Sequence, residues 1–289
     1  TLWSARSHAA CVTSSPRRPV CDMLESMSDN TPTEASVDAG HDGDWFDLPL
    51  AIVDVETTGL DPENDRVIEL GVVHMRGGQV EEVYSKLVDP ERELPPEVVN
   101  ITGIKPEDLE GAPTFAQVTE ELQAALKGRI FVAYNLPFDR AFVRNEFLRQ
   151  GVEWDPAQCI DPLVFIRELH RDQGSKRLEA VCTRLGIPLD AAHRASHDAE
   201  ATGHVLYKLR DQLPSDVDDL ILLQGQWAQK QENEMAGWRN RRGGAIGGGL
   251  GGAAMADRGN ALGPAYIYSD DTDPVRAMFM HLPTSGGRR

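Results

Sequence analysis

Apolar and β-branched residues gather in short runs near the start of the folded part of the chain. Residues 48–56 form an apolar run that is typical of a buried strand. Residues 67–73 and 83–88 have the same character, and the Gly77-Gly78 pair between them is a hairpin signal. We therefore expect the fold to begin with three antiparallel strands.

The hydrophobic period then changes to that of helices. Apolar residues recur at helical spacing over 115–126, and a short apolar strand at 130–134 follows. A segment from 137 to 150 opens on proline and is followed by Gly151, which favours a second helix. Further helices are expected at 178–185 and 199–209. This order predicts an α/β fold with a mixed sheet flanked by helices.

The two ends of the chain differ from its middle in composition. Residues 1–45 are rich in Ser, Thr, Pro, Asp and Gly without hydrophobic periodicity, so we expect a disordered segment. One folded domain is expected over 46–212. An additional helix is predicted over 213–242, and residues 243–289 open on a glycine-rich run typical of a flexible tail.

The charge of the chain is strongly negative, with 29 Lys and Arg against 46 Asp and Glu. Proteins that bind nucleic acids usually carry a basic footprint, so this balance argues at first against a polyanionic partner. Residues 46–128 alone hold 18 acidic and 6 basic side chains. The excess of acid therefore coincides with the stretch that holds the first candidate metal ligands.

The cysteines and the hydropathy indicate a compartment. The four cysteines are scattered, without the short spacings of a disulfide framework or of a zinc site. No stretch of 18 apolar residues is present, and the N-terminus lacks the apolar run of a signal peptide. We expect a cytoplasmic protein with reduced thiols and no membrane partner.

Asp54 and Glu56 are the first candidate for chemistry. Residues i and i+2 of a strand point to the same side, so these carboxylates stand together at the end of the 48–56 strand. Two anions held side by side next to an apolar core repel each other, and a divalent cation relieves the repulsion. An isolated pair of this kind is more often a strand end that faces solvent. The pair therefore needs support from elsewhere in the chain.

Two further acids supply that support. Asp139 directly follows the 130–134 strand, and Asp198 stands at the start of a helix. Each alone is explained by the favourable interaction of an acid with a helix N-terminus. Three such coincidences in one chain favour a shared metal site.

Three ordered motifs over about residues 46–210 carry a resemblance to a known family. They are Asp54-Val-Glu56-Thr57-Thr58-Gly59, Asn135-Leu-Pro-Phe138-Asp139 and His193-Arg-Ala-Ser-His197-Asp198-Ala199. The arrangement resembles the DEDDh, or DnaQ-like, 3′→5′ exonucleases, which include the proofreading epsilon subunit of DNA polymerase III, RNase T and oligoribonuclease. The second motif departs from the family pattern, because Tyr134 stands where a histidine is usual. The resemblance implies an RNase H-like fold.

The resemblance also implies a ligand set and a general base. Two Mg²⁺ or Mn²⁺ ions would be held by oxygen ligands only, which suits hard cations. These ligands would be Asp54, Glu56, Asp139 and Asp198. His193 would take a proton from the attacking water. His197 is the rival base, but it stands one residue before the last aspartate, whereas the base of the family stands five residues before it.

Substrate-binding residues are implied less directly. Family members hold the terminal nucleotide near the first motif, which implies Thr57 and Leu60, and Asn135 belongs to the second motif. Glu97 matches a position that contacts nucleotide in epsilon-like members. The family often has H-G-I where this chain has Thr102-Gly103-Ile104, so that contact is altered.

The sequence therefore predicts an exonuclease that removes 5′-mononucleotides from 3′ ends of single-stranded or frayed DNA, in proofreading or repair. One alternative keeps the fold and changes the substrate to RNA, since no motif reports contacts to the 2′-hydroxyl. A second alternative is a non-catalytic module that binds nucleic acid or protein on the same fold.

A last hypothesis concerns residues 215–240, which carry Trp227 and Trp238 at near-helical spacing. Such a helix either docks a DNA polymerase or another replication or repair partner, or covers the apolar surface of its own domain. We favour the second reading, because a helix with two tryptophans normally buries them.

Overall fold

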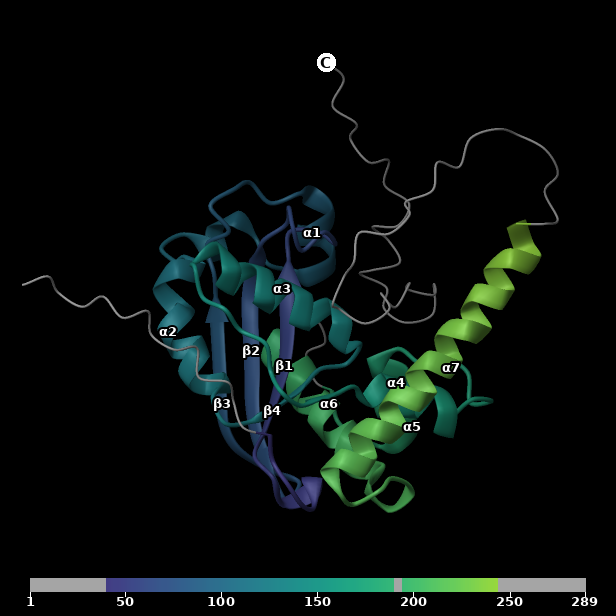
Figure 1. Cartoon of the computed structure of the whole chain (residues 1–289). Coiled ribbons are helices and arrows are strands. Elements are labelled where there is room, and N and C mark those ends of the chain that lie inside the picture. Colours follow the sequence, from purple (N-terminus) through teal and green to yellow (C-terminus); the bar gives the residue numbers. More distant parts are fainter. Residues whose placement is uncertain (1–39, 190–193, 244–289) are drawn as a thin grey trace, which may run out of the picture. The chain divides into compact units, whose positions relative to one another are not determined.

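A central sheet of five strands organises the protein (Figure 1). The computed structural model describes residues 40–189 and 194–243, with side chains described as far as residue 236. The strand order across the sheet is β3-β2-β1-β4-β5. The strands are β1 (Leu50–Thr57), β2 (Val67–Arg76), β3 (Gln79–Leu87), β4 (Ile130–Val132) and β5 (Cys159–Ile160).

The sheet is mixed. Strand β1 pairs antiparallel with β2 and parallel with β4, and β2 continues through a hairpin into β3. Gly77 and Gly78 form the hairpin turn, and both have positive φ angles, which glycine adopts without strain. The expected antiparallel start is confirmed, and so is the α/β fold class.

Seven α-helices are described around this sheet. They are α1 (Pro96–Thr102), α2 (Phe115–Leu126), α3 (Leu136–Arg149), α4 (Pro162–Leu169), α5 (Leu178–Leu185), α6 (Ala195–Lys208) and α7 (Val217–Gly243). Short 3-10 turns stand at Trp45–Asp47, Pro106–Leu109 and Arg210–Gln212.

The side chains of strand β1 point alternately into two apolar layers, one on each face of the sheet. Leu50 and Ile52 face a cluster shared with α4, α5, α6 and the start of α7. Ala51, Val53 and Val55 face the opposite cluster, which contains residues of α2 and α3. All five side chains are buried, so β1 is the centre of the core.

Helix α6 lies against β1 and β2 at close range. A Cβ atom at Gly203 would stand 2.2 Å from Met75 Sδ and 3.0 Å from Ile52 Cγ1. Only a residue without a side chain permits this approach. The helix is thereby fixed on the layer that contains Ile52.

Helix α7 packs on the domain through its first half. Val217 and Leu220 are fully buried in the α6 layer, and Trp227 packs edge to face on Phe165 with ring centroids 6.1 Å apart. Gln231 Nε2 donates to the Val164 carbonyl at 2.9 Å. These contacts agree with the reading in which the helix covers its own domain, whereas the side chain of Trp238 lies outside the described residues.

Several boundaries differ from the sequence prediction. Strand β3 begins four residues before the expected 83–88 segment, because its alternating polar residues are exposed at the sheet edge. Helix α1 and the two-residue strand β5 were not expected, since each is too short for a clear period. Helix α4 was not expected because it opens on five consecutive buried apolar residues, which show no helical period. Helix α6 begins at Ala195 and not at 199, so Asp198 lies inside its first turn.

The predicted disordered segment needs a correction at its end. Residues 1–39 lie outside the described part of the chain, as does most of the predicted tail, 244–289. Within 40–45, however, Trp45 is fully buried and its Nε1 donates to the Pro214 carbonyl at 2.8 Å. A single tryptophan in a polar segment carries no periodicity, which is why the pattern missed this contact. Among the described residues, no helix is both long and apolar enough to cross a membrane.

Candidate active site

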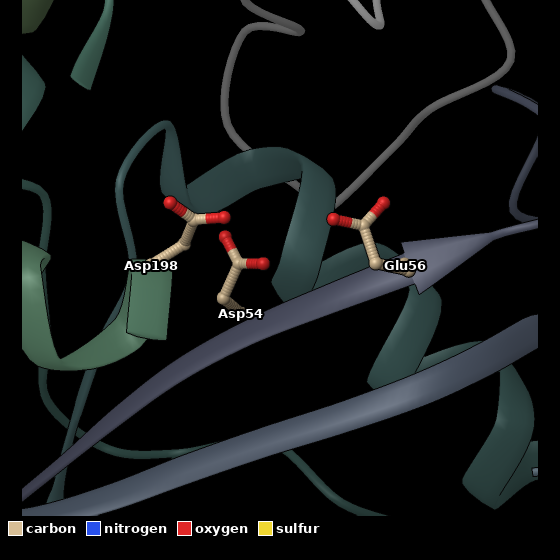
Figure 2. A group of neighbouring side chains, drawn as sticks. All are labelled: Asp54, Glu56 and Asp198. Atoms are coloured by element: carbon tan, nitrogen blue, oxygen red, sulfur yellow. The ribbon is translucent and has the colours of Figure 1, made fainter. Parts of the chain in front are cut away.

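Asp54 and Glu56 project from the same side of β1. They follow Leu50 and Ile52 at even spacing, so they continue the row of side chains that faces the α6 layer. Asp54 is partly exposed, and Glu56 is buried. Figure 2 shows both carboxylates rising from the strand toward the same space. The apolar row thus changes to an acidic pair where the strand approaches its end.

Asp198 completes a cluster with this pair. It lies in the first turn of α6, and its carboxylate faces that of Asp54 (Figure 2). Each of the three acids offers a carboxylate oxygen that lies within 4.8 Å of those of the other two. Residues 54 and 198, 144 positions apart in the sequence, are therefore brought together by the packing of α6 on the sheet.

Gly71 allows the helix to start at this place. It pairs with Asp54 across the β1–β2 ladder, so no side chain of β2 covers the α6 side of the sheet beside the aspartate. A Cβ atom at Gly71 would lie 2.2 Å from the carbonyl carbon of Ala195 and 2.4 Å from Ser196 N. Real Cβ atoms do not approach backbone so closely. The first residues of α6 therefore rest directly on the backbone of β2.

Asp139 reaches β1 from the opposite layer. It is fully buried in the first turn of α3, and its Oδ1 accepts from Val55 N at 3.2 Å. Strand β4 pairs with β1 only from Leu50 to Ile52, so beyond that point the carboxylate takes the place of a strand as acceptor. Val55 stands between Asp54 and Glu56. Asp139 thus lies beside the cluster on β1, although the compact group of three does not include it.

A buried acid that the sequence reasoning missed fixes the turn before Asp139. Asp161 accepts from Asn135 N at 3.0 Å and from Leu136 N at 3.1 Å, and caps α4 through Leu163 N at 3.0 Å. Burial raises the pKa of Asp161 to about 6, against the three amides that lower it. The Asp161-Pro162 pair at the start of a short apolar segment was the available signal, because Asp is a favoured cap and Pro a favoured first helical residue.

The turn after β1 is held by its own side chains. Thr57 Oγ1 donates to the Gly59 carbonyl at 2.6 Å, and Thr58 Oγ1 donates to Asp65 Oδ1 at 3.2 Å. A Cβ atom at Gly59 would lie 2.2 Å from Asp65 Oδ2, so a larger residue there would displace the carboxylate that binds Thr58. The ladder has an irregularity between Glu56 and Thr57. A local bulge of this kind redirects side chains at the end of a strand.

Tyr134, the departure from the family motif, is a core residue. It is buried in the α6 layer, and its hydroxyl donates to the Lys176 carbonyl ahead of α5. Burial raises the pKa of this phenol well above its usual range. Phe138 is also buried and packs on Phe142, with ring centroids 4.7 Å apart. Tyr134 therefore holds the loop before α5 through this hydrogen bond.

The expected substrate residues are spread over three elements. Thr57 and Leu60 lie at the end of β1 and in the turn after it, Asn135 precedes α3, and Glu97 is in the first turn of α1. Asn135 has a φ angle of 69°, and its buried Nδ2 has no hydrogen-bond partner within the described part of the chain. Thr102 hydrogen-bonds Val98 O and Ile104 N, so it closes the end of α1.

The histidines divide between described and undescribed residues. His193, the expected general base, lies outside the described residues. His197 is exposed in the first turn of α6, and its backbone N donates to Arg194 O.

The cluster fits a hard divalent cation. Its donors are carboxylate oxygens, and two elements of the fold bring them within 4.8 Å of one another. Without a cation, three anions at this spacing would repel each other in a partly buried site. The chemistry of the donor set thus fits a hard divalent cation.

Comparison with known proteins gives the following relatives. The RNase_T family, described as Exonuclease, matches residues 51–206. The DNA polymerase III PolC-type of Halalkalibacterium halodurans is 34% identical over 164 residues, which are 57% of this chain and 11% of that protein. The 3′-5′ exonuclease DinG of Staphylococcus haemolyticus is 31% identical over 169 residues, 57% of this chain and 19% of that protein. The chain thus spans less than a fifth of the length of either relative.

Solved structures share the fold. Exonuclease I of E. coli in complex with a dT13 oligonucleotide has a TM-score of 0.51 and 24% identity, over 56% of this chain and 40% of that one. The zinc-bound complex of the same enzyme with single-stranded DNA has a TM-score of 0.53 and 22% identity, over 57% and 41% of the two chains. At this identity the likeness establishes the architecture alone.

Proposed function

This chain belongs to the DEDDh, DnaQ-like exonuclease family, and we propose that it is a metal-dependent 3′→5′ exonuclease that releases 5′-mononucleotides from single-stranded or frayed DNA ends. The observation that carries the proposal is the cluster of Asp54, Glu56 and Asp198, whose carboxylate oxygens lie within 4.8 Å of one another. Asp139, bonded to the backbone of the same strand, is the fourth proposed ligand.

The four acids would hold two Mg²⁺ or Mn²⁺ ions. When bound, such ions would stabilise the negative charge that develops on the scissile phosphodiester. Asp54 and Glu56 come from a strand that pairs with β2 along its whole length, and Asp198 comes from a helix packed closely on the same sheet, so the protein would hold these ligands in place before substrate arrives. Preorganised ligands avoid a cost of rearrangement during the reaction.

His193 is the proposed general base. It precedes Asp198 by five residues, the spacing of the family motif, and a neutral imidazole can accept the proton of the attacking water near neutral pH. His197 is less suited to this role, because it stands directly beside the metal ligand in the sequence and is exposed.

DNA is the proposed substrate. One relative bears the name of a DNA polymerase and another that of a 3′-5′ exonuclease. Thr57, Leu60, Asn135 and Glu97 are the proposed contacts to the terminal nucleotide. A proofreading or repair role in the cytoplasm follows from this chemistry as part of the same proposal.

Labelled oligonucleotides test the activity and its direction. We expect a single strand labelled at its 5′ end to shorten one nucleotide at a time with Mn²⁺ or Mg²⁺, and a strand labelled at its 3′ end to release the label at once as a mononucleotide. EDTA should stop both reactions. The variant Asp54→Asn should lose roughly two orders of magnitude or more of the rate.

Glu63→Gln is the matched control, because Glu63 is an exposed acid in the turn after β1. This variant should keep the activity of the wild type. Release of label from the 5′ end, or equal activity of Asp54→Asn and the wild type, would rule out the proposed reaction at this cluster. An RNA strand degraded faster than DNA would keep the chemistry and change the substrate.

A further inference from the structure

Glu69 is a fully buried acid next to the cluster that has no place in the proposed ligand set. It lies on β2 and pairs with Glu56 across the ladder, so the two side chains share one face of the sheet. Arg194 donates to Glu69 Oε1 through Nε at 3.0 Å and through Nη2 at 2.9 Å. Ala195 N donates to Oε2 at 3.2 Å. One buried carboxylate thus binds both Arg194, the residue before α6, and Ala195, the first residue of the helix.

Arg194 connects this carboxylate to Asp198 through the backbone. Its carbonyl accepts from Asp198 N at 3.1 Å and from His197 N at 2.8 Å, which closes the first turn of the helix. Its extended backbone makes it the residue from which α6 starts. The position of Asp198 relative to β1 therefore depends on how Arg194 is held by β2.

The pair also controls the charge next to the cluster. An uncompensated Glu69 would add a further anion on the face that already carries Asp54 and Glu56. The Arg194 side chain is 51% exposed and forms an ion pair with the fully buried carboxylate. The pKa of Arg194 is raised chiefly by Glu69, with a smaller contribution from Glu56, so the guanidinium lies within electrostatic reach of the cluster.

We propose that Glu69 and Arg194 are positioning residues that set the divalent-metal affinity of the cluster. They hold Asp198 at the distance from Asp54 and Glu56 at which the three carboxylates share one cation, and they keep Glu69 from competing as a ligand. Residues behind metal ligands commonly act in this way, since they orient the ligands and adjust their charge. The inference rests on the proposed function, because it assumes that the cluster binds metal.

Three variants of the full chain separate the contributions. Glu69→Gln keeps the shape of the side chain but cannot accept from both Arg194 and Ala195 N with a full charge. Arg194→Met removes the ion pair and leaves Glu69 as a buried charge, whereas Arg194→Lys restores the charge without the two-pronged geometry. The double variant Glu69→Gln/Arg194→Met removes both partners, and two residues that act as one unit give effects that do not add.

Arg210→Met is the matched control. Arg210 forms an ion pair with Asp44 just beyond the opposite end of the same helix. The control therefore removes an arginine–carboxylate pair near α6 without touching the turn that carries Asp198.

The test is the binding of Mn²⁺ alone, followed through the electron paramagnetic resonance signal of free Mn²⁺, with thermal unfolding of each apoprotein beside it. We expect Glu69→Gln and Arg194→Met to raise the dissociation constant for Mn²⁺ roughly tenfold or more. The dissociation constant of Arg194→Lys should lie between those of these two variants and that of the wild type. The double variant should bind Mn²⁺ at least as tightly as the single variant with the lower affinity. Exonuclease activity should need correspondingly more Mn²⁺ and recover at saturation.

Two negative results have different meanings. If the wild type binds Mn²⁺ and all variants bind it equally well while only their unfolding temperatures fall, the pair is merely structural and the inference is wrong. If the wild type binds no Mn²⁺, the proposed function itself fails. Should Glu69→Gln not fold, the Arg194 variants decide the question, because that side chain is half exposed.

Discussion

At the scale of single residues, buried acids hold the elements that carry the candidate ligands. Glu69 binds the start of α6, and Asp161 binds the turn before α3. Glu146 of α3 is fully buried and accepts from Arg66 Nε at 2.9 Å and Val67 N at 3.1 Å, which ties that helix to the start of β2. A buried carboxylate is retained where it satisfies backbone amides and cations. These acids therefore hold the helices and the strand around the site in place without belonging to the candidate ligands.

The pH dependence of unfolding tests the role of Asp161. Its pKa is about 6 in the folded protein and 3.8 as a reference for the unfolded chain. The folded state therefore binds the proton of Asp161 more tightly than the unfolded chain does. The contribution of the protonated carboxyl group to the free energy of unfolding is complete below about pH 4 and is lost as the pH rises to about 6. The change amounts to about 2–3 kcal/mol.

Denaturant unfolding of the wild type and Asp161→Asn between pH 4 and pH 8 measures this contribution. The difference in unfolding free energy between the wild type and Asp161→Asn should shrink from pH 4 to pH 6 and then stay constant. An advantage that grows with pH would mean that the amide hydrogen bonds dominate and that the sign is wrong.

Two glycines give a matched pair of substitutions. Gly71→Ala would place a methyl group against the backbone of Ala195, so we expect a loss of about 2–4 kcal/mol in unfolding free energy and loss of nuclease activity. Gly225→Ala falls in α7, where no atom lies within 4 Å of the new Cβ, and should stabilise by about 0.5–1 kcal/mol. Thermal unfolding and the oligonucleotide assay measure both, and full activity of Gly71→Ala would contradict the described packing of α6.

The sequence singled out acids that the structure brings together, but not the residues that hold them in place. Asp54, Glu56 and Asp198 stand in recognisable motifs, and the structure brings them together. Glu69 stands inside an apolar strand pattern, where a lone acid is a signal of burial, but its partner Arg194 is 125 residues away in the sequence. Spacing carries no information about a contact at that separation, so the pair could only be found in three dimensions.

At the scale of elements, a clear hydrophobic period decided which predictions succeeded. Helices α2, α3 and α5 match the expected segments within a residue or so, because each has an apolar row and a clear end. Helix α1 escaped notice since seven residues give fewer than two turns of period. Strand β5 has two residues, and only its pairing with β4 defines it.

Helix α7 offers a test at this scale. Trp227 packs on Phe165, so Trp227→Ala should cost about 2–3 kcal/mol of unfolding free energy. Leu222 on the same helix is 62% exposed, and Leu222→Ala should change it by less than about 0.5 kcal/mol. Chemical denaturation measures both, and equal effects of the two substitutions would show that the helix does not pack as described.

At the scale of the whole molecule, the net charge of −17 opposes an anionic substrate. Bound divalent ions would cancel part of the charge at the cluster, so the proposed function predicts that metal is a condition for DNA binding as well as for hydrolysis. The acid excess of residues 46–128 is in this view a property of the site and its surroundings. The charge balance by itself argues against the partner class that we propose.

The dissociation constant for a single-stranded oligonucleotide should therefore depend on metal. In Ca²⁺, a hard cation that also takes oxygen ligands, we expect the affinity for the oligonucleotide to be at least roughly tenfold higher than in EDTA. Fluorescence anisotropy measures this difference. Equal affinity in both buffers would locate the DNA-binding surface away from the carboxylates.

If the carboxylate cluster performs metal-dependent hydrolysis, two acids of α6 must differ sharply in their effect on the rate. Asp198→Asn and Glu200→Gln each remove one charge from the same helix, but only Asp198 belongs to the cluster. With a 5′-labelled single strand and Mn²⁺, we predict that Glu200→Gln shortens the strand at the rate of the wild type and that Asp198→Asn leaves it intact over the same period. Equal rates for all three proteins would contradict the claim.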